Sequence, residues 1–149
     1  MKIEEILHHL KPGTELMIAN RPFTYGGKAT VELDGGDLRY WLFDADGNML
    51  SVSPDDEELM LFEPVGEELE PEDDLVTYDG RDHEFSYDDA GRVATVEGEA
   101  DVEEDARYKI ADYEDDDGAL VRLLTNEDTE DVYAYTGSVV VEDDIVAVE

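Results

Sequence analysis

Residues 39–52 read RYWLFDADGNMLSV. Two apolar runs flank an Asp-Gly pair, which suits the positive φ angles of a tight β-hairpin turn. Side chains alternate along a strand, so Tyr40 and Leu42 should lie on one face and Trp41 and Phe43 on the other. Because both faces are apolar, we expect a central strand that is covered on both sides.

The same pattern of apolar runs and turns continues along the chain after Gly13. Strands at regular spacing that are joined by such turns predict an all-β, antiparallel meander, closed as a roll or as a barrel-like sandwich. Five dipeptides that end in Gly mark the expected turns: Asp34-Gly35, Asp46-Gly47, Asp79-Gly80, Ala90-Gly91 and Asp117-Gly118.

One short helix is expected at the N-terminus, over residues 2–11. Ile3, Ile6, Leu7 and Leu10 follow the spacing that places apolar side chains on one helix face. A Pro-Gly pair then stops the helix. Because so short a helix is marginally stable alone, we expect it to dock as a lid over one end of the sheet.

The chain as a whole, residues 1–149, is predicted to be a single domain. After the helix it divides into a β-unit over 14–62, an acidic linker over 63–74 and a second β-unit over 75–148. The two units look alike, since each has an apolar run, an Asp-Gly turn and further apolar runs. The sequence leaves open whether this is a duplication or the self-similarity that any meander of hairpins shows.

Charge dominates the composition. The chain has 43 Asp and Glu against 10 Lys and Arg, a formal charge of -33 at pH 7, yet 41% of its residues are hydrophobic. It can therefore bury a core, but it lacks the clustered basic residues that bind nucleic acid or anionic lipid directly. No apolar run is long enough to cross or insert into a membrane, and no signal segment is visible. We expect a cytoplasmic protein.

Three explanations of the acidity remain open at this stage. It could be an adaptation to concentrated salt, which screens the self-repulsion. It could imitate nucleic acid, with carboxylates standing in for phosphates against a basic partner. It could also be an ordinary solubility surface on a binding module. The acidic residues are spread along the chain, which favours the first and third explanations.

The inventory of catalytic side chains is thin. The chain has no Cys, and its His residues are the adjacent pair His8-His9 near a helix end and His83 in a strand-like run. Adjacent helical residues point about 100° apart and cannot chelate one ion together. No nucleophile–base pair, phosphate loop or dinucleotide motif is visible. We predict no enzymatic activity and no cofactor.

The sharpest metal-like string is the turn that contains Asp44, Asp46 and Asn48, which resembles the start of an oxygen-rich Ca²⁺ loop. A full EF-hand loop fails, because its sixth position is Met49 instead of Gly and its twelfth is Asp55 instead of Glu. A looser Ca²⁺ site and a plain polar hairpin turn are the two interpretations.

Several runs resemble motifs of one known family. In the second half they are RVATVEGE at 92–99, Asp112-Tyr113, LLTNE at 123–127, Glu130 and Tyr135-Thr136-Gly137; in the first half they are Trp41-Leu42-Phe43-Asp44, Gly47 and Leu50-Ser51-Val52. Together they resemble the bacterial domain-of-unknown-function family 4178, from about Gly13 to Val148. The sequence departs from the family pattern at Met49, Ser53 and Ala100.

The resemblance implies an all-β domain without an established activity and an association with membrane-stress proteins of the phage-shock type. With the composition, it leads us to expect a non-catalytic module that binds a protein partner, which the sequence does not identify. The alternatives are an acidic nucleic-acid mimic that binds a DNA- or RNA-binding protein, and a Ca²⁺-responsive β-protein.

Overall fold

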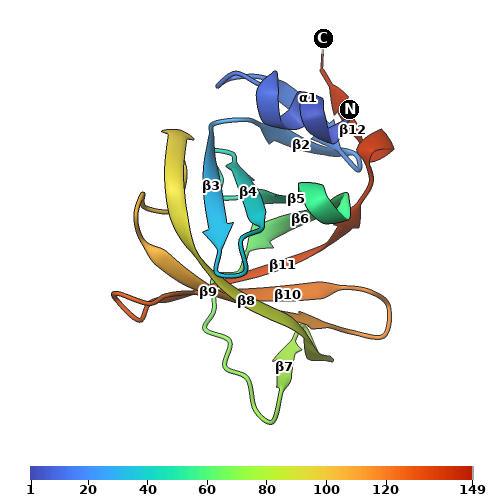
Figure 1. Ribbon diagram of the computed structural model, residues 1–149. Helices are drawn as coiled ribbons and strands as arrows, with labels where there is room; N and C mark the ends of the chain where they lie inside the picture. The colour runs from blue at the N-terminus through green and yellow to red at the C-terminus, as the bar shows by residue number, and fades with distance from the viewer. Residues whose placement is uncertain (149) are drawn as a thin grey trace.

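The computed structural model describes residues 1–148, and β-strands dominate it, as the sequence predicts (Figure 1). Eight antiparallel strands close into a barrel, because β3 pairs with β8 as well as with β4. No helix in this part of the chain is long and apolar enough to cross a bilayer. The barrel strands are β3 (Gly27–Leu33), β4 (Leu38–Phe43), β5 (Met49–Ser53), β6 (Glu58–Pro64), β8 (Arg81–Gly98), β9 (Arg107–Glu114), β10 (Leu120–Asn126) and β11 (Val132–Val140).

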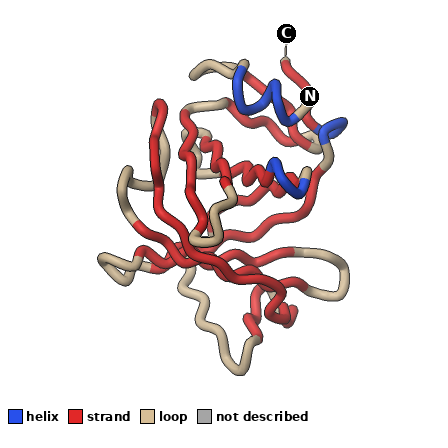
Figure 2. Tube along the Cα trace, in the orientation of Figure 1, coloured by secondary structure: helices blue, strands red, loops and turns tan. Residues whose placement is uncertain are grey.

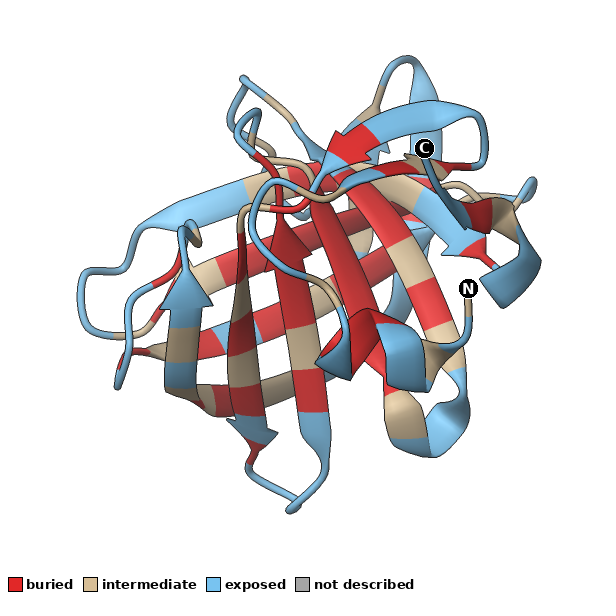
Figure 3. Cartoon of the chain, turned by 90° about the horizontal axis from the view of Figure 1, so that it is seen from above, coloured by how far each residue is buried: buried red, intermediate tan, exposed pale blue. Residues whose placement is uncertain are grey.

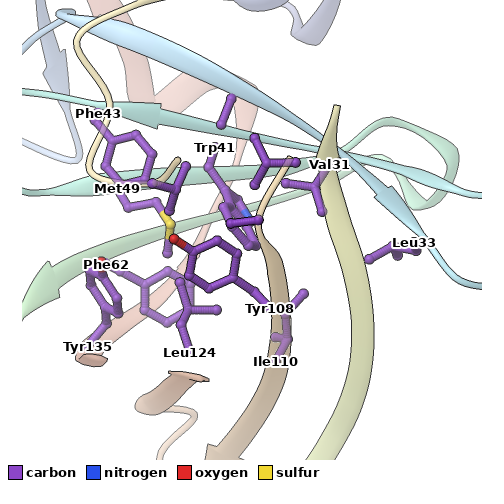
Figure 4. Packing of buried hydrophobic residues seen from close by; sticks show 14 of the residues in the cluster. Val31, Leu33, Trp41, Phe43, Met49, Phe62, Tyr108, Ile110, Leu124 and Tyr135 are labelled. Atoms are coloured by element: carbon purple, nitrogen blue, oxygen red, sulfur yellow. The ribbon is translucent and has the colours of Figure 1, made fainter. Parts of the chain in front are cut away.

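The barrel interior is filled with apolar side chains over most of its length. Trp41 and Phe43 point into this core, where the Trp41 ring meets Tyr108 edge-to-face at 6.1 Å between ring centroids (Figure 4). Leu42 belongs instead to a second cluster on the outer face of β4, and Tyr40 packs against that cluster. Figure 3 shows buried positions concentrated along the middle of the strands. The predicted central strand with two covered faces is therefore confirmed.

A small second sheet and the helix cover this outer face of the barrel. The sheet has the order β12-β1-β2, and Ile6 and Leu7 of the helix join its apolar side chains in the second cluster. The elements are α1 (Ile3–His8), β1 (Glu15–Ile18), β2 (Arg21–Thr24) and β12 (Ile145–Ala147), with short 3₁₀ helices at Pro54–Asp56 and Glu142–Asp144.

The helix is shorter than the predicted range 2–11. Lys2 is its N-cap residue, with an extended backbone and no side-chain hydrogen bond, and His9 is its C-cap residue, so residues 9–11 lie outside the helix. It packs with the small sheet on the outer wall of the barrel and does not form the predicted lid over one end of the sheet. The amino group of Met1 donates to the carbonyls of Glu142 and Ile145, at 2.8 and 2.7 Å, and this joins the two ends of the chain.

One predicted turn is wrong. Ala90-Gly91 lies inside the single strand β8, which bends around the barrel and pairs with β9 and then with β3. A Cβ at Gly91 would stand under 3.0 Å from the carbonyl oxygen of Glu32. Glycine is needed at this position for the close approach of two strands.

The two predicted β-units contribute equally to the barrel. The 14–62 unit divides between the sheets, with β1 and β2 in the small sheet and β3–β6 in the barrel; β8–β11 supply the other four barrel strands. The first strands of the two sets pair with each other, β3 with β8, and so do the last, β6 with β11. The two halves thus have the same strand order within the barrel.

Equivalent turns in the two halves are built alike. Asp44 Oδ1 accepts hydrogen bonds from the backbone N–H groups of Asp46 and Asn48. Asp115 Oδ1 accepts the corresponding bonds from residues 117 and 119. A Gly with positive φ, Gly47 or Gly118, completes each turn. This is the turn chemistry that the Asp-Gly pairs predict.

Candidate functional site

The acidic segment between the two halves lies against the barrel. Strand β6 runs on to Pro64, so the predicted linker 63–74 is reduced to residues 65–74, which we call the strap (tan, before β7, in Figure 2). The strap leads to β7 (Leu75–Tyr78), which pairs with β8 outside the barrel. Its start is fixed by a 2.9 Å hydrogen bond from the N–H of Val65 to the carbonyl of Ala134.

Leu69 anchors the middle of the strap. It packs against a third apolar cluster on the outer face of β9 and β10, which contains Tyr113, Val121 and Leu123. The composition of this segment predicts a linker, because acidic residues surround Leu69 on both sides. The signal that identifies the anchor is its isolation, since a single large aliphatic residue in an acidic run has to be buried or exposed at a cost.

The strap borders a groove on each side. The first groove, of about 680 Å³, lies between the strap and the start of β11. Its apolar wall includes Val65, Leu69, Val132 and Tyr133. Its carboxylates are Glu67, Glu68, Glu70, Glu130 and Asp131.

The second groove, of about 650 Å³, lies over β9 and β10. Ala111, Tyr113 and Leu123 give it an apolar wall, and Leu69 and Val132 line both grooves. Its charged residues are Glu70, Asp88, Asp89 and Lys109.

The apolar side chains of these grooves are accessible to solvent, and most of the charged residues that line the grooves are acidic. Val132 is 53% exposed and Tyr133 is 44% exposed, although both are large apolar side chains. Burial, and then the negative charges of Asp74 and Asp88, raise the pKa of the Tyr113 hydroxyl. An apolar surface with a carboxylate rim favours a partner group that is both apolar and cationic.

The anchoring role of Leu69 gives a testable prediction. Leu69→Ala should reduce stability by only about 1 kcal/mol, because the side chain is half-buried. It should, however, free the strap locally, so that a glutamate-specific protease cuts residues 67–72 several times faster. Leu38→Ala, at an exposed position of β4, is the matched control. Equal cleavage of the Leu69→Ala protein and the unaltered chain would show that Leu69 does not hold the strap.

The predicted metal residues lie together in one turn. The Asp44 carboxylate accepts three hydrogen bonds, two from backbone N–H groups and one from the Asn48 side chain at 2.9 Å. Burial and the charge of Asp44 raise the pKa of nearby Asp101. Within residues 1–148, no three His, Cys, Asp or Glu side chains group as a metal site. Calcium binding stays a prediction, checked by comparing Tm in matched Ca²⁺ and Mg²⁺.

The three histidines lie on two separate elements, the adjacent pair at the end of α1 and His83 in β8. His8 and His9 are exposed at the end of α1. His83 is buried in β8, with its Nε2 3.9 Å from Asp115 Oδ2. They form no common site.

By its fold, this protein is a closed antiparallel β-barrel with an accessory sheet, and the strap lies on the outer face of the barrel. The family model described as "Domain of unknown function (DUF4178)" matches residues 11–142, and the chain therefore belongs to that family. The matched region includes the complete barrel and the strap. Neither the curated proteins nor the solved structures include a significant match.

Proposed function

We propose that this protein is a non-catalytic interaction module that binds a basic segment of a partner protein in the grooves beside the strap. The observation on which the proposal rests is the combination, in one surface, of exposed apolar side chains and a rim of carboxylates. The partner segment would place one or two aliphatic side chains against Val132 and Leu69. Its Lys or Arg residues would face the carboxylates of the strap.

Charge complementarity selects this occupant. With a formal charge of -33, the chain repels acidic peptides at long range and accelerates the encounter with basic ones. Charge alone gives little specificity. Contacts with the apolar walls of the grooves would give the specificity that a polyanion without such walls does not have. The association with membrane-stress proteins of the phage-shock type, which the family resemblance implies, suggests where such a partner would be sought.

The test uses a short lysine-rich peptide with two leucines and a second peptide in which alanines replace the leucines. We expect the leucine peptide to bind about tenfold more tightly, and both affinities to fall between about 50 and 200 mM salt. Val132→Ser should remove the preference for leucine. Val146→Ser, at an equally exposed position of β12, should leave it intact.

The alternatives give different results in the same titration. Equal affinity for the two peptides, with steep salt dependence, would mean that only charge is recognised, as expected of a nucleic-acid mimic. No binding of the leucine peptide, or an unchanged preference in Val132→Ser, would overturn the proposed groove.

A further inference from the structure

The two ends of the barrel differ. At the end where β8 leads into β9, the connecting loop 99–106 folds inward, and its Val102 and Ala106 are buried in the interior core. At the opposite end a cavity of about 440 Å³ opens between the strands. This volume is within the range of small-molecule sites, and eight-stranded barrels are wide enough to hold one small ligand.

The floor of this cavity is a buried ion pair. Arg122 is 4% exposed and binds both carboxylate oxygens of Asp112, through Nε at 2.7 Å and Nη2 at 2.8 Å. Its Nη1 donates to Ser51 Oγ at 2.9 Å. The guanidinium also lies over the Phe62 ring, 4.5 Å from its centroid. These contacts hold the floor rigidly.

A second arginine in the cavity wall is incompletely bonded. Arg39 is only 9% exposed, and its Nη2 donates to the hydroxyl of Tyr87 at 3.2 Å and lies 3.7 Å from Asp56 Oδ2. Its Nη1 is buried and has no hydrogen-bond partner among the described residues. Buried guanidinium donors almost always have an acceptor, so this group calls for an oxygen that the chain itself does not supply.

The mouth of the cavity carries unpaired negative charge, in contrast to the unpaired arginine donor in its wall. Glu58 and Glu114 line it, and neither carboxylate has a basic partner within ion-pair distance in residues 1–148. Apolar side chains lie beside them, namely Met60, Leu120 and Val139. The cavity thus joins an unpaired donor, unpaired carboxylates and an aliphatic surface.

We propose that this cavity binds a small zwitterion of the aliphatic α-amino acid type. Its carboxylate pairs with the Arg39 guanidinium, which turns toward the cavity so that Nη1, buried in the free protein, donates to it. Its ammonium group faces Glu58 and Glu114, and its aliphatic part packs on Met60 and Leu120. A simple anion would meet a cavity whose carboxylates outnumber its arginines. A simple cation would leave the Arg39 donor without an acceptor. Only a molecule with both groups meets both needs.

Three probes that share one isobutyl group separate these possibilities: L-leucine, isocaproate, which lacks the amino group, and isoamylamine, which lacks the carboxylate. In calorimetric titrations of the full chain we expect L-leucine to bind at least about tenfold more tightly than either. Arg39→Met should weaken the binding of L-leucine and isocaproate but not that of isoamylamine. Glu58→Gln combined with Glu114→Gln should weaken L-leucine and isoamylamine.

Two further variants serve as controls. Arg21→Met removes a largely exposed arginine on β2 and should change none of the affinities. Arg39→Lys keeps the positive charge in the wall, so it guards against a folding defect in Arg39→Met and should bind L-leucine with intermediate affinity. The proposal is overturned if L-leucine does not bind at millimolar concentration, if isocaproate or isoamylamine binds equally well, or if folded Arg39→Met and Arg39→Lys bind L-leucine unchanged.

Discussion

Replacing Arg122 with Met is expected to lower the free energy of unfolding by about 3–5 kcal/mol. The change removes the guanidinium that binds both oxygens of Asp112, and Asp112 is itself only 2% exposed. A buried carboxylate without its partner carries the full cost of leaving water. The measurement is Tm, which should fall by about 6–20 °C, since each kcal/mol shifts the Tm of a domain of this size by about 2–4 °C.

The double variant distinguishes the lost charge partner from lost packing. Adding Asp112→Asn to Arg122→Met removes the unpaired charge and should restore a large part of the stability. Arg21→Met is the matched control, because Arg21 and Glu63 are 3.8 Å apart and both more than half exposed, and it should cost less than about 1 kcal/mol. A double variant as unstable as the single one would contradict the explanation by charge.

The architecture could be predicted from the sequence where local signals decide it. The hairpin at 39–52 forms as predicted, because alternation and an Asp-Gly turn both act over a few residues. The division of β1, β2 and β12 into a separate sheet could not be predicted, since it depends on pairing between Leu16 and Ala147, at opposite ends of the chain. Gly91 could not be assigned from the sequence either. A glycine that allows two strands to approach closely has the same appearance in the sequence as a glycine in a turn.

The candidate site residues are harder to find for a related reason. Arg122 alternates with Leu120 and Leu124, so it shares the inward face of β10, and an arginine in such a row is a detectable signal. The neighbouring positions of β10 are buried as well, and so the periodicity does not say which face is the interior. Nothing local to Arg39 indicates that its donor lacks an acceptor. That property depends on which strands close around it.

Gly137→Ala is expected to be the second strongly destabilising change. Gly137 lies on β11 opposite Phe62 of β6, where the two halves of the barrel meet. An added Cβ would stand well under 3.0 Å from the carbonyl oxygen of Leu61, and also under 3.0 Å from the Phe62 ring. Because a backbone carbonyl cannot move aside without breaking the strand pairing, we expect a loss of about 3 kcal/mol. Thermal or urea unfolding measures it.

The control for this prediction is Gly35→Ala. A Cβ at Gly35, in the turn between β3 and β4, meets nothing within 4 Å. That change should be neutral or slightly stabilising, because it only reduces the freedom of the unfolded chain. If both variants unfolded alike, the approach of β6 and β11 would not depend on glycine. A loss confined to Gly137→Ala would mean that β6 and β11 can approach each other at this point because position 137 has no side chain.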